Sequence, residues 1–286
     1  MAIVLDNITY TYGMGTPFEK TALRGVSLTI ENGEFLGIIG HTGSGKSTFV
    51  QHLNGLLHPT TGTVTVNGVD ISASTEEAKK MRHKVGMVFQ YPEHQLFEET
   101  IAQDIAFGPK NLGLGADDVD ERVRDAMKFV GLDYDTYAER SPFHLSGGQM
   151  RRVAIAGVVA MDPDFLVLDE PSAGLDPFGR EEIFEEIIRL HKEKGITVIL
   201  VSHNMEDISR MASRLVVLDK GRIVLDGEPM DIFNNHRDEL QAVGVDVPPV
   251  SVTMEYLREQ GLDVSNRVLS VDDAVQAILE GGNHVK

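Results

Sequence analysis

The stretch FLGIIGHTGSGKST, residues 35–48, joins an apolar run to a glycine-rich loop and a lysine followed by two hydroxyl side chains. The apolar run from Phe35 to Ile39 predicts a buried strand, and a helix is expected from Lys46. Between them, residues 40–48 fit G-x-x-x-x-G-K-[ST] in the strand–loop–helix context that this pattern requires. The sequence therefore predicts a phosphate-binding loop.

The residue types of this loop suit a nucleotide triphosphate. Backbone N–H groups can surround the phosphate oxygens, and the helix N-terminus adds positive potential. Lys46 is expected to reach the β- and γ-phosphates, and the Ser47 hydroxyl is expected to ligate Mg²⁺. The candidate ATP-binding residues of the loop are Gly40, His41, Thr42, Gly43, Ser44, Gly45, Lys46, Ser47 and Thr48.

A second apolar run ends in two carboxylates. Residues 165–168 (FLVL) predict another buried strand, and Asp169 and Glu170 follow it. Ligands bind at the carboxyl edge of a parallel sheet, where such residues emerge. Asp169 is therefore expected in the Mg²⁺ shell, and Glu170 as the base that orients the attacking water. An ordinary strand end is the alternative interpretation.

The stretch LSGGQ, residues 145–149, precedes a helix expected from Met150. Its serine and glycines offer a hydroxyl and exposed N–H groups for a second phosphate contact, although a helix N-cap has a similar composition. Lying between the phosphate loop and the Asp-Glu strand, these residues match in full the signature of the ATP-binding-cassette (ABC) ATPases. The resemblance covers roughly residues 1–227 and implies that Ser146, Gly147, Gly148 and Gln149 act on ATP held by a partner ATPase.

The resemblance implies roles for further residues. Tyr12 resembles the aromatic residue that stacks on adenine, and Gln90 resembles the glutamine that contacts Mg²⁺ and senses the transmembrane partner. Residues 172–176 (SAGLD) resemble the loop that contacts the second ATPase, and His203 resembles the switch histidine at the γ-phosphate. The structural alternatives are an edge-strand tyrosine, a polar strand terminus and an unremarkable strand-end histidine. No catalytic position is degenerate, so hydrolysis by Lys46, Glu170 and His203 is expected.

A narrower resemblance rests on His41-Thr42, residues 89–100 (FQYPEHQLFEET) and residues 145–157 (LSGGQMRRVAIAG). These stretches resemble the ATPases of energy-coupling factor (ECF) transporters, in particular the second, A-prime, subunit type. The resemblance implies pairing with a paralogous ATPase and docking on a transmembrane T subunit, while separate membrane subunits bind a vitamin or other micronutrient. A homodimeric cobalt or nickel importer ATPase remains the alternative.

Composition limits the partners. The chain has 286 residues and a net charge of −18, which argues against nucleic acid or anionic lipid as the main partner. It has no cysteine, so disulfide and thiolate chemistry are excluded. Neither a signal peptide nor the ~18 consecutive apolar residues of a membrane-spanning helix are expected. With the resemblance, this predicts a peripheral subunit at the cytoplasmic face of the cell membrane.

The predicted fold is α/β, with an ABC nucleotide-binding domain in residues 1–230 and a helical extension in residues 231–286. The domain should combine a parallel sheet, an antiparallel β-subdomain and an inserted helical subdomain at about residues 91–142. Further strands are expected at residues 3–5, 8–10, 26–30, 63–66, 85–89, 196–201 and 214–218, and further helices at 177–195 and 205–211.

Charge sets the inserted segment apart from the rest of the chain. Residues 91–141 contain twelve acidic and five basic side chains. By resemblance, this segment forms the groove for the arginine-bearing coupling helices of the T subunit; a solvated acidic face is the alternative. In the extension, Pro248-Pro249 precedes two short amphipathic helices, the second opened by Ser270. The family uses this region for contact between ATPases, although an inert tail is possible.

Overall fold

Two β-sheets form the centre of the molecule in the computed structural model, which describes residues 1–265 and 267–282. A four-stranded antiparallel sheet has the order β2-β1-β4-β5, and a six-stranded sheet has the order β10-β9-β3-β8-β7-β6. The strands are β1 (Ala2–Tyr12), β2 (Lys20–Glu31), β3 (Phe35–Ile39), β4 (Thr61–Val66), β5 (Val69–Asp70), β6 (Val85–Val88), β7 (Phe165–Asp169), β8 (Thr197–Val201), β9 (Arg214–Asp219) and β10 (Arg222–Gly227).

The six-stranded sheet is parallel except for β10, which pairs antiparallel with β9. Every residue of β3, β7 and β8 is buried, as expected for strands covered on both faces. Alternate side chains enter two cores. Leu166 and Leu168 join the cluster beneath the helices, whereas Phe165 and Val167 join the one shared with the antiparallel sheet.

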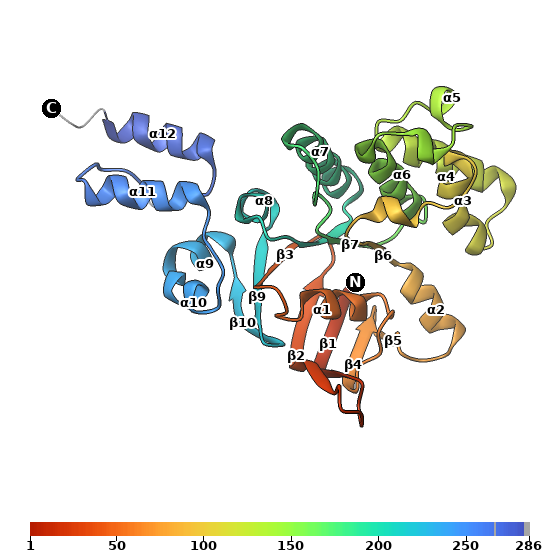
Figure 1. Cartoon of the computed structure of the whole chain (residues 1–286), viewed down its shortest axis with the longest axis horizontal. Coiled ribbons are helices and arrows are strands. Elements are labelled where there is room, and N and C mark those ends of the chain that lie inside the picture. Colours follow the sequence, from red (N-terminus) through yellow and green to blue (C-terminus); the bar gives the residue numbers. More distant parts are fainter. Residues whose placement is uncertain (266, 283–286) are drawn as a thin grey trace.

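The helices are α1 (Lys46–Leu53), α2 (Glu76–His83), α3 (Ile101–Asn111), α4 (Ala116–Phe129), α5 (Tyr134–Tyr137), α6 (Gly147–Val159), α7 (Pro177–Lys194) and α8 (Met205–Met211), with short 3-10 turns at Pro92–Gln95 and Pro142–His144. Helices α1, α7 and α8 follow parallel strands, α2 lies between β5 and β6, and α3 to α6 fill the segment between β6 and β7. Helices α3 to α6 gather at one side of the sheets (Figure 1). The predicted α/β cassette fold is confirmed.

Several element bounds differ from those predicted. The two expected strands at residues 3–5 and 8–10 form the single strand β1, with a register shift between Leu5 and Ile8. Helix α6 begins at Gly147 rather than at Met150. Strand β10 was not predicted, because its residues alternate only between exposed and half-buried.

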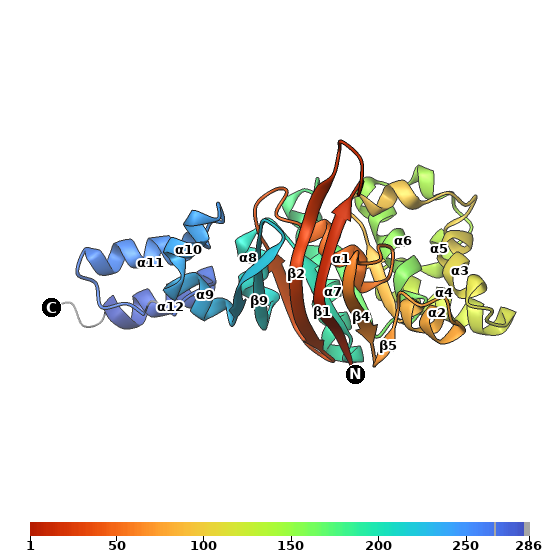
Figure 2. The same ribbon diagram turned by 90° about the horizontal axis from the view of Figure 1, so that it is seen from below.

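The C-terminal region contains α9 (Pro229–Asn235), α10 (Arg237–Ala242), α11 (Pro249–Glu259) and α12 (Val271–Gly282). Phe233 of α9 and Leu240 of α10 belong to the same core as the parallel sheet, and neither helix was predicted. A separate small cluster around Met254 holds α11 and α12. These two helices project at the end of the molecule opposite α3 to α6 (Figure 2).

Because α9 and α10 share the main core, we propose that the nucleotide-binding domain extends past the predicted boundary at residue 230. We likewise propose that the inserted helical subdomain and the C-terminal extension are each a structural unit. Within the predicted extension 231–286, residues 266 and 283–286 lie outside the described residues.

Candidate nucleotide-hydrolysis site

The phosphate-binding loop leaves the carboxyl end of β3 and enters α1 at Lys46. Gly40 has a φ of 152°, and a Cβ built there would lie 2.3 Å from the Leu218 carbonyl oxygen. Because that oxygen belongs to the backbone of β9, only glycine fits the loop against this strand. Ser44 Oγ is buried in the loop and has no hydrogen-bond partner among the described residues.

Lys46 crosses the interior of the loop. Its Nζ donates hydrogen bonds to the carbonyl oxygens of Gly40 (2.6 Å) and His41 (3.1 Å), and only 7% of the residue is exposed. Burial lowers the pKa of Lys46, while the nearby carboxylates of Glu170 and Asp169 oppose that shift. The ammonium group therefore lies near the predicted base Glu170 and the predicted Mg²⁺ ligand Asp169.

Asp169 ends β7, and the side chain of Ser47, from α1, lies near its carboxyl group. Burial raises the pKa of Asp169, and the nearby Ser47 hydroxyl lowers it in part. The structure therefore brings together the two residues predicted to ligate Mg²⁺ from β7 and α1.

Glu170 follows Asp169 with a φ of 52°, a left-handed conformation that is uncommon for a residue with a side chain. Its N–H donates to the Val201 carbonyl oxygen at 3.0 Å, which fixes it beside the end of β8. Burial raises the pKa of Glu170 to about 7, and the nearby backbone N–H of His203 opposes this shift. This pKa suits a general base at neutral pH.

His203 lies at the end of β8, next to Glu170. Its Nε2 is 3.2 Å from Glu170 Oε1, but the two atoms do not meet hydrogen-bond geometry, and Oε1 has no partner among the described residues. Burial and the charge of Lys46 lower the pKa of His203, so the ring is mainly neutral at pH 7. Within the described residues, Glu170 Oε1 is thus a buried acceptor without a hydrogen-bond donor.

A cleft of about 730 Å³ extends from the phosphate loop toward Tyr12. The Tyr12 hydroxyl lies 3.1 Å from Thr48 Oγ1, and the ring packs edge-on against Tyr10. Four cations that were not predicted from the sequence also line this cleft: Lys20, Arg24, Lys220 and Arg222. They come from β2 and the β9–β10 hairpin, and no sequence motif joins these segments to the loop.

Comparison with known proteins agrees with this geometry. Residues 23–173 match the ABC transporter family. The chain is 53% identical over 280 residues to the energy-coupling factor transporter ATP-binding protein EcfA2 of Clostridium tetani, covering 98% of this chain and 97% of that protein. The chain belongs to the energy-coupling factor ATP-binding family of ABC ATPases.

Other relatives of this ECF ATPase support the same assignment. EcfA2 of Symbiobacterium thermophilum is 52% identical over 278 residues, covering 97% of this chain and 96% of that protein. Among solved structures, cbiO1 of Clostridium perfringens, part of an ABC transporter complex, has a TM-score of 0.74 and 36% identity, covering 88% of this chain and 98% of its own. A dimeric ATP-binding cassette holding ADP and Pi has a TM-score of 0.70 and 30% identity, with coverages of 79% and 98%.

The signature of the ECF ATPase forms the start of α6. Ser146 Oγ accepts from the Gln149 N–H at 3.3 Å, and Gln149 Oε1 accepts from the Ser146 N–H at 3.1 Å. This reciprocal capping box starts the helix at Gly147, three residues before the predicted Met150. Within the described chain, none of the residues 146–149 lines the cleft at Lys46.

Gln90 is exposed and follows β6, the strand that pairs with β7. Val88 lies opposite Leu168, so Gln90 leaves the sheet at the edge where Asp169 ends β7. No hydrogen bond links Gln90 to the other candidate residues in the described part of the chain. Its contact with Mg²⁺ remains a prediction.

A buried arginine, Arg151, forms hydrogen bonds that connect three segments of the chain. No role for it was predicted from the sequence. Its guanidinium donates to both carboxylate oxygens of Glu93, at 3.1 and 3.0 Å. It also donates to the carbonyl oxygens of Pro171 (3.0 Å) and Ala173 (2.8 Å). Arg151 thereby connects α6 to the segment after Gln90 and to the loop after Glu170.

Proposed function

We propose that this ECF ATPase drives uptake of a vitamin or other micronutrient by hydrolysing ATP held at the phosphate loop, with Glu170 as the base. The observation that carries the proposal is the buried Oε1 of Glu170, which lies beside His203 near Lys46 and has no hydrogen-bond partner among the described residues. A carboxylate with a pKa of about 7 can orient a water molecule and accept its proton at neutral pH.

The remaining site residues have binding and orienting roles in this proposal. The backbone of residues 40–48 and the Lys46 ammonium hold the β- and γ-phosphates, and Tyr12 stacks on adenine. The mainly neutral His203 ring donates a hydrogen bond to the γ-phosphate as charge moves onto it. Most of the rate enhancement then comes from position and charge complementarity rather than from a covalent intermediate.

Mg²⁺ would be held by Ser47, Asp169 and Gln90. Hydroxyl, carboxylate and amide oxygens are the donors that Mg²⁺ prefers, and the closeness of the Ser47 hydroxyl to the Asp169 carboxyl group supports a shared ion. When bound, the ion would neutralise negative charge on the phosphates.

The partners follow from the family. We propose a heterodimer with a paralogous ATPase, docked at the cytoplasmic face of the cell membrane on a transmembrane T subunit that also carries the substrate-binding subunits. No helix within residues 1–265 and 267–282 has the length and apolarity needed to cross a bilayer. In the heterodimer, residues 146–149 would complete the site for ATP held by the partner, and α11 and α12 would contact the other ATPase.

Purification of the complex tests this assignment. A tagged copy of the chain is expressed in its native membranes, the membranes are solubilised, and the co-purifying proteins are identified. One paralogous ATPase, one T subunit and several small membrane proteins are expected. Recovery of two copies of this chain with no paralogue would instead favour the homodimeric cobalt or nickel importer ATPase.

A further inference from the structure

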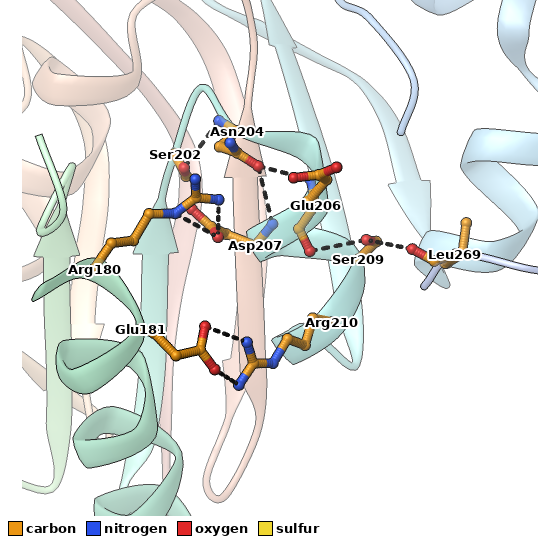
Figure 3. Close-up of polar contacts among 9 residues, drawn as sticks. All are labelled: Arg180, Glu181, Ser202, Asn204, Glu206, Asp207, Ser209, Arg210 and Leu269. Carbon is orange, nitrogen blue, oxygen red and sulfur yellow. Dashed lines mark hydrogen bonds and ion pairs between the residues drawn. The ribbon is translucent and has the colours of Figure 1, made fainter. Parts of the chain in front are cut away.

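Two ion pairs join α7 to α8 (Figure 3). In one, a single carboxylate oxygen, Oδ1 of Asp207, accepts two hydrogen bonds from the Arg180 guanidinium. The first comes from Nε at 3.1 Å and the second from Nη2. In the other, Arg210 pairs with Glu181 at 2.6 Å. In the first pair the carboxylate is buried, with 7% of the Asp207 side chain exposed. In the second pair the Arg210 and Glu181 side chains are 44% and 48% exposed.

Asp207 lies in the first turn of α8, four residues after His203. Asn204 Oδ1 accepts from the N–H groups of Glu206 and Asp207, at 2.9 and 3.2 Å, and so caps α8. The Asn204 N–H in turn donates to Ser202 Oγ at 3.0 Å (Figure 3). His203 lies between Ser202 and Asn204, which these hydrogen bonds hold in place. The position of His203 therefore depends on that of the first turn of α8.

Arg180 belongs to the first turn of α7, directly after the loop at residues 172–176. Its N–H donates to the Asp176 carbonyl oxygen at 3.0 Å, and the Asp176 carboxylate accepts from the Gly179 N–H at 2.7 Å. The loop itself begins two residues after Glu170. The Arg180–Asp207 pair therefore bridges the segment after the proposed base and the segment after the switch histidine.

Stability alone does not account for this pair. Burial raises the pKa of Asp207, and its Oδ2 has no hydrogen-bond partner in the described part of the chain. A buried ion pair with an unsatisfied oxygen contributes little to folding compared with apolar side chains of similar volume. The charge of Asp207 also raises the pKa of Glu170, so the carboxylate lies near the catalytic centre.

We propose that Arg180 and Asp207 are positioning residues for ATP hydrolysis, which hold His203 in a set relation to the loop at residues 172–176. The inference rests on the proposed role of His203 at the γ-phosphate. When the second ATPase approaches, the loop moves and shifts Arg180. Because Arg180 pairs with Asp207, the first turn of α8 moves with it. His203 reaches the γ-phosphate only when the loop is in place.

The test measures steady-state hydrolysis by the assembled transporter with Arg180→Met and Asp207→Asn. We expect kcat to fall about ten- to a hundredfold in each variant, with the KM for ATP changed by less than about twofold, because misplaced catalytic groups cost rate rather than binding. The matched controls are Glu181→Gln and Arg210→Met, which break the neighbouring exposed pair and should leave kcat within about twofold. Arg180→Lys should restore part of the lost rate.

A double-mutant cycle separates positioning from general structural damage. If Arg180 acts through His203, then Arg180→Met should cause no further loss of kcat in a His203→Ala background. Additive losses would overturn the inference, as would unchanged kcat in both buried-pair variants. If His203→Ala itself leaves kcat intact, the proposed catalytic site has failed, and that outcome is distinct from failure of the positioning role alone.

Discussion

His203 Nε2 lies 3.2 Å from Oε1 of Glu170, and the two residues follow the adjacent strands β8 and β7. The contact places a mainly neutral ring against a carboxyl group whose pKa is raised by burial to about 7. Among the described residues, no hydrogen-bond donor pairs with this buried oxygen. The predictions that follow concern this centre and the segments that position it.

Replacing Glu170 with Gln keeps the size of the side chain but removes the proton acceptor. ATP should still bind and hold the closed dimer, while turnover in the assembled complex should fall by about two orders of magnitude or more. Steady-state phosphate release and retained ATP are the measurements. Near-normal hydrolysis by this variant would remove Glu170 from the mechanism.

The raised pKa of Glu170 predicts the pH dependence of the reaction. The base is active when deprotonated, so kcat/KM should rise with pH through about 7 and level off above it. A pH series of ATP hydrolysis by the complex gives this profile. The residual activity of the Glu170→Gln variant should lack the rise; a profile that retains it would assign the titration to another group.

Lys46 and Ser146 should affect ATP binding differently. Lys46 lies within the phosphate loop of this chain, whereas Ser146 caps α6 and is proposed to act on ATP held by the partner. Lys46→Ala should weaken nucleotide binding by the isolated chain strongly, and Ser146→Arg should change it little. Titration of both purified variants decides the point. Loss of ATP binding by a folded Ser146→Arg chain would contradict a site shared between two ATPases.

Arg151 should contribute to the stability of the cassette. Arg151→Met leaves the largely buried Glu93 carboxylate and two carbonyl oxygens without their donor, which should lower the free energy of unfolding by about 3–5 kcal/mol. Urea denaturation measures the change. Arg152→Met is the control, since its pair with Glu182 is partly exposed and should contribute about 1 kcal/mol or less. Equal losses in the two variants would contradict the special role of Arg151.

Contiguous motifs were predictable because their chemistry is local. The strand 35–39 and the helix from Lys46 were confirmed, since an apolar run and a glycine loop act on their own backbone. The same holds for α7, where Asp176 caps the helix and Gly195 ends it. The start of α6 was predicted wrongly at Met150, because the two glycines of LSGGQ suggested a loop, whereas the capping box draws them into the first turn.

By itself, the sequence determined the cassette fold, its family and which side chains are candidates for the chemistry, because each of these depends on residues close together in the chain. The tertiary structure alone decided which distant residues meet. Arg151 reaches Glu93 across 58 positions, and Arg180 reaches Asp207 across 27. The pKa of Glu170 likewise depends on burial produced by the assembled sheet. No local pattern encodes such contacts, since desolvation and pairing arise only when separate strands and helices pack together.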